Sequence, residues 1–534
     1  RLAAPAARDP RLPMIDGDMQ AWALTLDKFL DHAARWRPDG QVVTARGGGR
    51  VDRVGYDGLR TRSRKVSAAL IGLGIAPGDR VATLAWNSQA HVEAWYAVMG
   101  MGAVCHTLNP RLTEAQLVSM VSQSRARILI ASADLEPVAR RIVARTPSLE
   151  RLLVIDAEAE GADQLEPLIA RETGDGVVWG DFAETTPSGL CFTSGTTGAP
   201  KGVSYTHRSS YLHTLRLLQA DVMGITGSDS VLAAVPMFHA NAWGLPFAAP
   251  AAGARLVLPG RWLDGASLAG LINSEGVTLA VGIATVWLGL VEHLDAHGGD
   301  TPTLERVVVG GAPMPPALMD RIEQRLGVTV QTSWGMTEMS PLGTCAPLNG
   351  PRAAQLSGRP AVGVDLLLTD AEGQPLPEQR GVEGHLHVRG EAVLDRYFGE
   401  TDPATNADGW FATGDLARID AAGNLIITGR AKDLIKSGGE WINPAEIEAV
   451  INEHPAVSLA AVIGRADPKW GERPVLVIQA RDTPDVSDED LLAALRGRVA
   501  PWWIPDAVIR VGQMALASTG KIDKMRLRVD YGDS

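Results

Sequence analysis

Residues 193–202, TSGTTGAPKG, form a loop of small and hydroxylated residues with one lysine. The loop follows the apolar run 189–192, so it leaves a predicted strand. Small residues let backbone N–H groups turn inward around an anion, and the hydroxyls and the lysine add donors and positive charge. A flexible surface loop is the alternative for such a composition. The combination favours a phosphate site, although Pro200 excludes the common P-loop spacing.

The elements that must position this loop follow an alternating pattern. Residues 80–84 read as a strand, and Ser88 can cap the helix after it. The apolar run 103–108 precedes Thr113, which begins a capping-box pattern, and another short strand is expected at 128–131. Strands that alternate with helices are typical of a parallel sheet. The alternation returns with strands expected at 231–235, 255–258, 277–281, 306–309 and 328–332, which predicts two βα-layered sheets.

The pattern changes after Gly358, where segments become short and are separated by turns. Apolar runs at 386–388 and 425–428 suggest antiparallel hairpins. A small α+β unit is expected beyond Arg430. Its predicted elements are helix 444–453, strands 457–463 and 474–479, helix 487–498 and strand 507–511. We therefore expect a large domain at 1–430 and a small one at 431–534.

Composition narrows the classes of function. With 45% hydrophobic and 21% charged residues over 534 positions, the chain resembles a globular protein that is too long for one ordinary domain. Its 62 acidic and 50 basic residues give a net charge of −12, which argues against a nucleic-acid partner. Three scattered cysteines fit a reducing cytoplasm. The charge-free stretch 230–254 contains three prolines, so we expect no transmembrane segment.

The loop and five later motifs resemble the adenylate-forming superfamily, which includes acyl-CoA synthetases, firefly-type luciferases and peptide-synthetase adenylation domains. The later motifs follow in the family's order: PMFH at 236–239, SWGMTE at 333–338, WFATGD at 410–415, GRAKDLIKSGGEWINP at 429–444 and STGKID at 518–523. The resemblance covers nearly the whole chain. It implies an α/β fold with two βα-layered sheets and a β-barrel in a large N-terminal domain, followed by a small mobile α+β C-terminal domain.

The resemblance also implies a reaction. A carboxylate attacks the α-phosphate of ATP and forms an acyl-adenylate and pyrophosphate, after which AMP is a good leaving group. Such a step depends on positioning and on charge neutralisation. The implied triphosphate ligands are Thr193, Ser194, Gly195, Thr196, Thr197, Gly198 and Lys201.

Several further residues match the family's nucleotide site. Thr337 would bind the α-phosphate, Glu338 would hold Mg²⁺, and Lys521 would neutralise the carboxylate and the α-phosphate in catalysis. Asp415 would accept hydrogen bonds from the two ribose hydroxyls, because one carboxylate has two oxygens. The remaining implied nucleotide contacts are Gly311, Ala312, Pro313, Trp334 as the adenine-stacking aromatic, Gly335, Met336 and Arg430.

A second conformation is implied for thioester formation. Lys432 corresponds to the family's hinge, about which the small domain would rotate. The rotation would turn the loop 437–441 toward the active site, where its backbone would line a tunnel for the CoA thiol. The loop residues are Ser437, Gly438, Gly439, Glu440 and Trp441. This sequence has Ala515-Leu516-Ala517 where relatives often carry Pro, a basic residue and Thr, which leaves open how the Lys521 loop is anchored.

The acid-binding residues implied by the resemblance are His239, which is also a catalytic candidate, Trp243, Gly310 and Met336. Amino-acid-activating relatives carry Asp at the position of His239, so an α-amino acid is disfavoured. Small and apolar neighbours predict an acid with an apolar tail. The motifs look most like those of medium-chain fatty acyl-CoA synthetases and the 3-methylmercaptopropionate-CoA ligase group, with an aryl-alkanoic acid as the alternative.

These inferences predict an acid–thiol ligase with ATP, Mg²⁺ and CoA as cofactors or co-substrates, and they are compatible with a homodimer. One rival is an adenylating enzyme that loads a carrier protein. Another is a non-catalytic nucleotide or acyl sensor, which the presence of Lys521, Glu338 and the loop disfavours.

Overall fold

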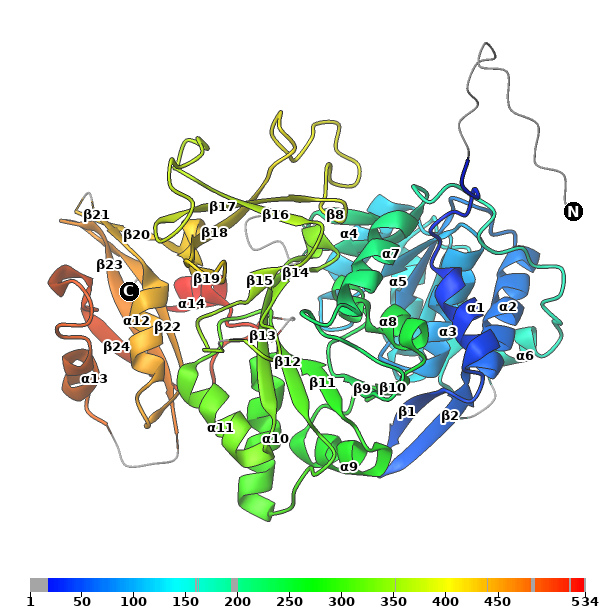
Figure 1. Ribbon diagram of the computed structural model, residues 1–534, viewed down its shortest axis with the longest axis horizontal. Coiled ribbons are helices and arrows are strands. Elements are labelled where there is room, and N and C mark those ends of the chain that lie inside the picture. The colour runs from blue at the N-terminus through cyan, green and yellow to red at the C-terminus, as the bar shows by residue number, and fades with distance from the viewer. Residues whose placement is uncertain are drawn as a thin grey trace, which may run out of the picture.

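The computed structural model describes residues 18–158, 161, 163–193, 200–350, 352–438, 440–481, 486–517 and 520–532. Of the predicted site, Ser194, Gly195, Thr196, Thr197, Gly198 and Gly439 lie outside the described residues. The described chain forms four sheets in a large N-terminal part and a small C-terminal part (Figure 1). The fold is mixed α/β, which confirms the predicted class.

A six-stranded sheet, in the order β6-β5-β3-β4-β7-β8, carries the glycine-rich loop between its last two strands. Its strands are β3 (Arg80–Leu84), β4 (Val104–Thr107), β5 (Ile128–Ser132), β6 (Arg151–Ile155), β7 (Pro187–Phe192) and β8 (Gly202–Thr206). Its helices are α2 (Tyr56–Gly72), α3 (Gln89–Gly100), α4 (Glu114–Ser124), α5 (Glu136–Arg145), α6 (Glu166–Ile169) and α7 (His207–Leu217), with the 3₁₀ turn η1 (Ala133–Leu135).

Local signals placed two of these helices correctly. The Ser88 side chain accepts a hydrogen bond from the His91 N–H at the start of α3, and Thr113 forms the predicted capping box of α4. Every residue from His91 to Gly100 is buried, because α3 packs against α2, β4 and β1.

The second sheet has nine strands, in the order β15-β14-β13-β12-β11-β9-β10-β1-β2. The strands are β1 (Gln41–Gly47), β2 (Arg50–Gly55), β9 (Ser230–Ala233), β10 (Arg255–Leu258), β11 (Leu279–Gly282), β12 (Arg306–Val309), β13 (Thr329–Gly335), β14 (Leu342–Cys345) and β15 (Arg359–Pro360). The associated helices are α1 (Asp27–Trp36), α8 (Leu245–Ala252), α9 (Gly265–Glu275), α10 (Ala284–His297) and α11 (Pro316–Leu326). Trp95 of α3, Phe247 of α8 and Val281 of β11 share one core that joins the two sheets.

The segment expected to form a barrel is a four-stranded antiparallel sheet with β16 and β19 at its edges. Its strands are β16 (Val364–Thr369), β17 (Glu383–Gly390), β18 (Phe411–Ile419) and β19 (Leu425–Arg430). Leu386, Phe411 and Leu425 bury one face of the sheet in a core that also contains Trp334 of the predicted nucleotide site and the nearby Met339. The sheet therefore packs directly against the SWGMTE motif.

The C-terminal part is a five-stranded sheet with flanking helices. It comprises β20 (Ile435–Ser437), β21 (Glu440–Ile442), β22 (Val457–Asp467), β23 (Gly471–Ala480), β24 (Ala507–Val511), α12 (Pro444–Asn452), α13 (Asp488–Ala494), η5 (Pro501–Trp503) and α14 (Lys524–Tyr531). The helix predicted at 487–498 ends early, at Ala494, because Gly497 turns the chain with a φ of 76°.

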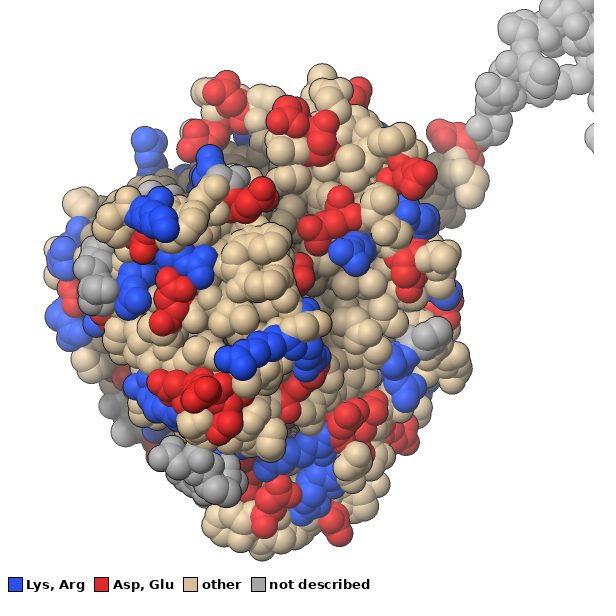
Figure 2. All heavy atoms as spheres, turned by 90° about the vertical axis from the view of Figure 1, so that its left-hand side faces the viewer, with Lys and Arg blue, Asp and Glu red and all other residues tan. Residues whose placement is uncertain are grey.

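The proposed domain boundary after residue 430 falls between β19 of the four-stranded sheet and β20 of the C-terminal sheet, and it stays a prediction. Viewed from the side of the C-terminal sheet, the surface shows Lys and Arg interspersed with Asp and Glu (Figure 2). No helix in the described ranges combines the length and the apolar character that a membrane span requires.

Candidate active site

The base of the glycine-rich loop is a closed hairpin. Phe192 and Gly202 are paired at the ends of β7 and β8. The Thr193 N–H donates to the Lys201 carbonyl at 2.9 Å, and the Lys201 N–H donates to Thr193 Oγ1 at 3.4 Å. Of the predicted loop ligands, Thr193 and Lys201 are therefore placed together at the edge of the first sheet.

The turn after β13 carries the second cluster of predicted residues. Trp334 and Gly335 end β13, and Thr337 and Glu338 lie in the 3₁₀ turn η3 (Thr337–Met339). A Cβ at position 335 would lie 2.1 Å from the Pro341 carbonyl oxygen, so only glycine fits this close approach of two backbone segments. The Tyr205 hydroxyl donates to the Thr337 carbonyl at 2.7 Å and ties the turn to β8.

Glu338 has a partner that sequence reasoning missed. The hydroxyl of Tyr397 donates to Glu338 Oε1 at 2.9 Å, and the Lys201 ammonium lies 4.8 Å from the centroid of the same tyrosine ring. Burial and the negative charge of Glu338 raise the pKa of Tyr397. Tyr397 lies in the irregular connection between β17 and β18, where no periodic pattern marks it.

Asp415 is buried, with 2% of its surface exposed, and both of its oxygens have partners. Trp334 donates its indole N–H to Oδ2 at 2.9 Å, and Arg430 pairs with Oδ1 at 2.8 Å from the neighbouring strand. Burial raises the pKa of Asp415, while Arg430 and Trp334 oppose this change. Each carboxylate oxygen can accept a further hydrogen bond, so a diol can still bind here.

Lys521 reaches this cluster from the C-terminal part. Its Cε lies 3.7 Å from the point where a Cβ on Gly311 would stand. Burial and the positive charge of Arg430 lower the pKa of Lys521 to about 8, although Asp415 and Glu338 act in the opposite direction. The structure thus brings Lys521 together with the two predicted carboxylates, although it lies 106 positions after Asp415 in the sequence.

The Lys521 loop is anchored without the basic residue that relatives often carry. The Ala517 N–H donates to the Lys521 carbonyl at 2.7 Å, and the Asp523 N–H donates to the Ala515 carbonyl at 2.8 Å. Just beyond the loop, Lys524 forms an ion pair of 2.7 Å with the partly buried Glu448 of α12. Backbone hydrogen bonds and this pair therefore hold the hairpin.

Trp243 lies close to the Gly310–Gly311 turn, and His239 directly precedes the short helical turn that carries Trp243. A Cβ on Gly310 would lie 3.0 Å from Cη2 of Trp243, and one on Gly311 would lie 3.9 Å from its Cζ2. The short turn η2 (Ala240–Gly244) is left-handed, with φ of 47° at Ala242 and 53° at Trp243. Such backbone is costly for residues other than glycine and often marks functional sites.

Burial and the neighbouring Lys521 charge lower the pKa of His239 to about 4. The imidazole is therefore neutral at physiological pH and can hydrogen-bond without adding positive charge. The turn after β12 continues with Ala312 and Pro313, and β13 is followed by Met336. Because β12 and β13 are parallel neighbours, these residues lie at the same edge of the second sheet.

The predicted CoA loop belongs to the C-terminal sheet in this conformation. The Gly438 N–H donates to the Trp470 carbonyl at 2.7 Å, and Trp441 is 54% exposed beside Lys436. Ser437 and Glu440 are paired in the β20–β21 hairpin. Lys432 lies in the short turn η4 (Ala431–Asp433), where burial lowers its pKa.

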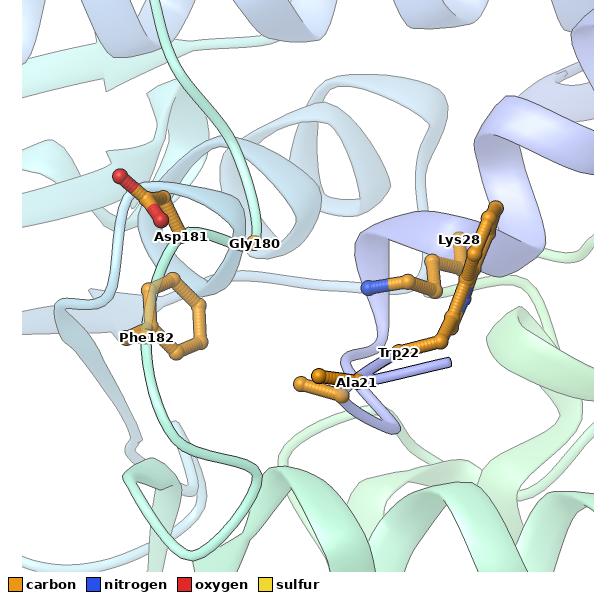
Figure 3. A pocket seen from close by; sticks show the side chains of 7 residues that line it. Ala21, Trp22, Lys28, Gly180, Asp181 and Phe182 are labelled. Carbon is orange, nitrogen blue, oxygen red and sulfur yellow. The ribbon is translucent and has the colours of Figure 1, made fainter. Parts of the chain in front are cut away.

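An open pocket of about 400 Å³ lies elsewhere, at the start of α1 (Figure 3). Trp22, Lys28 and Phe182 are among its walls. None of the predicted site residues that the structure describes lines it, so the pocket is separate from the cluster around Lys521.

Comparison with known proteins identifies the family of the chain. The family model of the AMP-binding enzymes matches residues 30–398, and that of their C-terminal domain matches residues 446–521. The chain is 41% identical to the 3-methylmercaptopropionyl-CoA ligase of Ruegeria lacuscaerulensis, covering 97% of this chain and 99% of that protein. It is 40% identical to the medium-chain-fatty-acid–CoA ligase of Ectopseudomonas oleovorans, covering 97% and 98%.

Solved structures show the same similarity. The anthranilate CoA ligase AuaEII in complex with anthranoyl-AMP has a TM-score of 0.87 at 25% identity, covering 95% of this chain and 97% of that one. ATP-bound MatB from Rhodopseudomonas palustris has a TM-score of 0.84 at 26% identity, covering 94% and 99%. The matches extend over both parts of the chain, so the chain belongs to the AMP-binding enzyme family.

Proposed function

We propose that this enzyme activates a carboxylic acid with an apolar tail as its acyl-adenylate and transfers the acyl group to CoA, with Mg²⁺ bound to the ATP. The position of Lys521 carries the proposal: the C-terminal part places an ammonium beside Gly311 and within the electrostatic reach of Glu338 and Asp415. The similar proteins of known activity are CoA ligases, which supports a free thiol as acceptor.

In the first half-reaction, a carboxylate oxygen attacks the α-phosphorus of ATP, and the bond to the β-phosphate oxygen breaks as pyrophosphate leaves. Lys521 would lie between the two anions and lower their repulsion. Lys201 and the loop would hold the leaving phosphates, and Thr337 would hydrogen-bond the α-phosphate. Asp415 would hold the ribose, with Trp334 beside the adenine.

The residues present fit a magnesium ion. Glu338 offers a hard carboxylate oxygen in a buried position, and Mg²⁺ commonly uses one or two carboxylates together with substrate phosphates. Bound there, the ion would neutralise charge on the phosphate oxygens. The protein's part is to orient the carboxylate, which Tyr397 does by donating a hydrogen bond to one of its oxygens.

In the second half-reaction, the CoA sulfur attacks the acyl carbon and AMP departs. Lys521 is not needed for this step, whereas the 437–441 loop would have to approach the acyl group by rotation near Lys432. Gly438 has a φ of 60° and lies against the Trp470 ring, so the backbone at this position has the left-handed conformation that glycine favours.

The walls next to Lys521 favour an uncharged acid tail. Trp243 is 7% exposed and lies against Gly310, and His239 is neutral at physiological pH. Neither group supplies a charge for an amino or a second carboxylate group. We propose medium-chain or methylthio-substituted alkanoic acids as substrates, with arylalkanoic acids as the second choice.

The test is a screen of AMP release over short, medium, branched, thioether and aryl acids, with and without CoA. AMP release that requires CoA and no carrier protein is the expected result. Pyrophosphate release without CoA-dependent AMP release would favour carrier-protein loading. The absence of pyrophosphate release with every acid would favour a sensor.

A further inference from the structure

Tyr397 joins three segments that are far apart in the sequence. Its hydroxyl donates to Glu338 Oε1 in η3 at 2.9 Å. The ammonium of Lys201, at the base of the glycine-rich loop, lies over the Tyr397 ring, 4.8 Å from the ring centroid. The ring also packs edge-on against Phe411 of β18, with centroids 6.4 Å apart. One side chain therefore contacts both ionic groups expected to act on the triphosphate.

Backbone hydrogen bonds fix the position of Tyr397 from both sides. The Phe398 N–H donates to the Gly202 carbonyl at 2.8 Å, directly after the loop lysine. The Leu394 N–H donates to the Glu338 carbonyl at 2.7 Å. A Cβ on Gly202 would lie 2.9 Å from the Cβ of Phe398, so the two segments are in close contact. The ring is thus held between two anchors.

The arrangement keeps two opposite charges apart. A lysine ammonium and a carboxylate at short range would pair and neutralise each other. Within the described part of the chain Lys201 forms no ion pair: its ammonium lies over the tyrosine face, while Glu338 accepts from the tyrosine edge. A ring face attracts a cation without cancelling its charge, and a phenol hydroxyl orients a carboxylate without neutralising it.

We propose that Tyr397 is a positioning residue that holds Lys201 and Glu338 apart, so that Lys201 stays available to the β- and γ-phosphates and Glu338 to their metal ion. The inference rests on the proposed roles of these two residues in MgATP binding. It requires neither the acid nor CoA, so it can be tested independently of the overall reaction.

The experiment measures MgATP and AMP binding to the full-length protein by calorimetry, with Mg²⁺ titrated at fixed ATP. Tyr397→Phe keeps the ring and removes the hydroxyl. We expect it to raise the Mg²⁺ concentration for half-maximal ATP binding about tenfold, as for one lost hydrogen bond to a charged group. AMP, which lacks the β- and γ-phosphates, should bind as in the wild type. Tyr211→Phe, in α7 against Phe29, is the matched control and should change neither value.

Tyr397→Leu removes the ring as well, so Lys201 and Glu338 can pair. We expect MgATP binding to weaken about threefold more than in Tyr397→Phe. In a Lys201→Met background, the Leu substitution should cost less than it does in the wild type, because no lysine remains to pair with Glu338. Melting temperatures of all variants verify that they are folded.

Unchanged Mg²⁺ dependence in Tyr397→Phe would overturn the proposal. An equal loss of AMP binding would also overturn it, because that loss would reflect general damage to the nucleotide site. If the effects of Tyr397→Leu and Lys201→Met on MgATP binding were strictly additive, Tyr397 would not be keeping Lys201 and Glu338 apart. If MgATP binding responds as expected while the acid screen yields no AMP, the positioning role stands and the proposed reaction fails.

Discussion

At the scale of single residues, the charge of Lys521 depends on its surroundings. Burial and Arg430 disfavour the ammonium, whereas Asp415 and Glu338 favour it, and the resulting pKa is about 8. His239 has a pKa of about 4, so it stays neutral throughout the range in which Lys521 titrates. The acid–base behaviour of the first half-reaction should therefore depend mainly on Lys521.

This predicts an alkaline loss of adenylation. Since the lysine is positively charged only below its pKa, kcat/KM for pyrophosphate release should fall as pH rises above about 8, because kcat/KM reports the free enzyme. Lys521→Arg, which stays protonated, should be slower but should lose this alkaline limb. A wild-type profile that is level to about pH 10, where the lysine would be largely neutral, would contradict the assignment.

Removal of the same ammonium should separate the two half-reactions. Lys521→Ala should slow pyrophosphate release by about 10²–10³-fold, the usual effect of losing one preformed electrostatic contact. Thioester formation from a supplied acyl-adenylate should stay close to the wild-type rate. Rapid-quench measurement of each step checks this, and an equal loss in both steps would refute the division of roles.

At the scale of secondary-structure elements, α7 holds the start of β14, just after the turn that carries Thr337 and Glu338. His213 accepts from the Leu342 N–H at 3.0 Å, and Arg216 donates to the Leu342 carbonyl at 3.0 Å. Arg216, with 2% of its side chain exposed, also pairs with Glu391 just beyond β17. Helix α7, which belongs to the first sheet, thus fixes the start of β14 in the second sheet and the end of β17 in the four-stranded sheet.

Breaking this pair should destabilise the large part of the protein. Arg216→Met leaves the Leu342 carbonyl and Glu391 without their donor, which should lower the free energy of unfolding by about 3 kcal/mol. Denaturant titration followed by tryptophan fluorescence measures the change. Arg140→Met, which removes the surface ion pairs with Glu136 and Asp163, is the control and should cost about 0.5 kcal/mol or less. Equal midpoints for the two variants would show that the buried pair contributes little.

At the scale of the whole molecule, Lys521 and the 437–441 loop both belong to the C-terminal part, and we propose that they act in different half-reactions. In this structure Lys521 lies beside Gly311 at the proposed nucleotide site, while Trp441 is half-exposed. For the 437–441 loop to take the place of Lys521 at this site, the C-terminal part would have to rotate as a rigid body. The connection at η4, between β19 and β20, is the short segment in which such a rotation can occur.

Restricting that connection should affect one half-reaction more than the other. Lys432→Pro fixes one backbone angle at the proposed hinge. We expect thioester formation to slow by about tenfold while pyrophosphate release changes by less than about threefold, because the structure shown already has Lys521 in place. Single-turnover assays of both steps provide the measurement. A normal overall rate would locate the hinge elsewhere.

The sequence by itself determined the local features and their order. Periodicity and caps located β3, β10, β12 and the starts of α3 and α4, because these depend on residues within one turn or strand. Motif resemblance then indicated Lys201, Glu338, Asp415 and Lys521, although no single segment of the sequence shows how close these residues lie in space.

Only the tertiary structure decided which of these side chains meet. Trp334 and Asp415 are 81 positions apart, and Arg216 and Glu391 are 175 apart, so no local pattern reports either contact. Tyr397 was not predicted, because it lies in the irregular connection between β17 and β18. The turn at Ala240–Gly244 was not predicted either, because its non-glycine residues adopt positive φ angles that such residues rarely adopt. Contacts of this kind are set by how the sheets pack, which depends on the whole chain rather than on any short window.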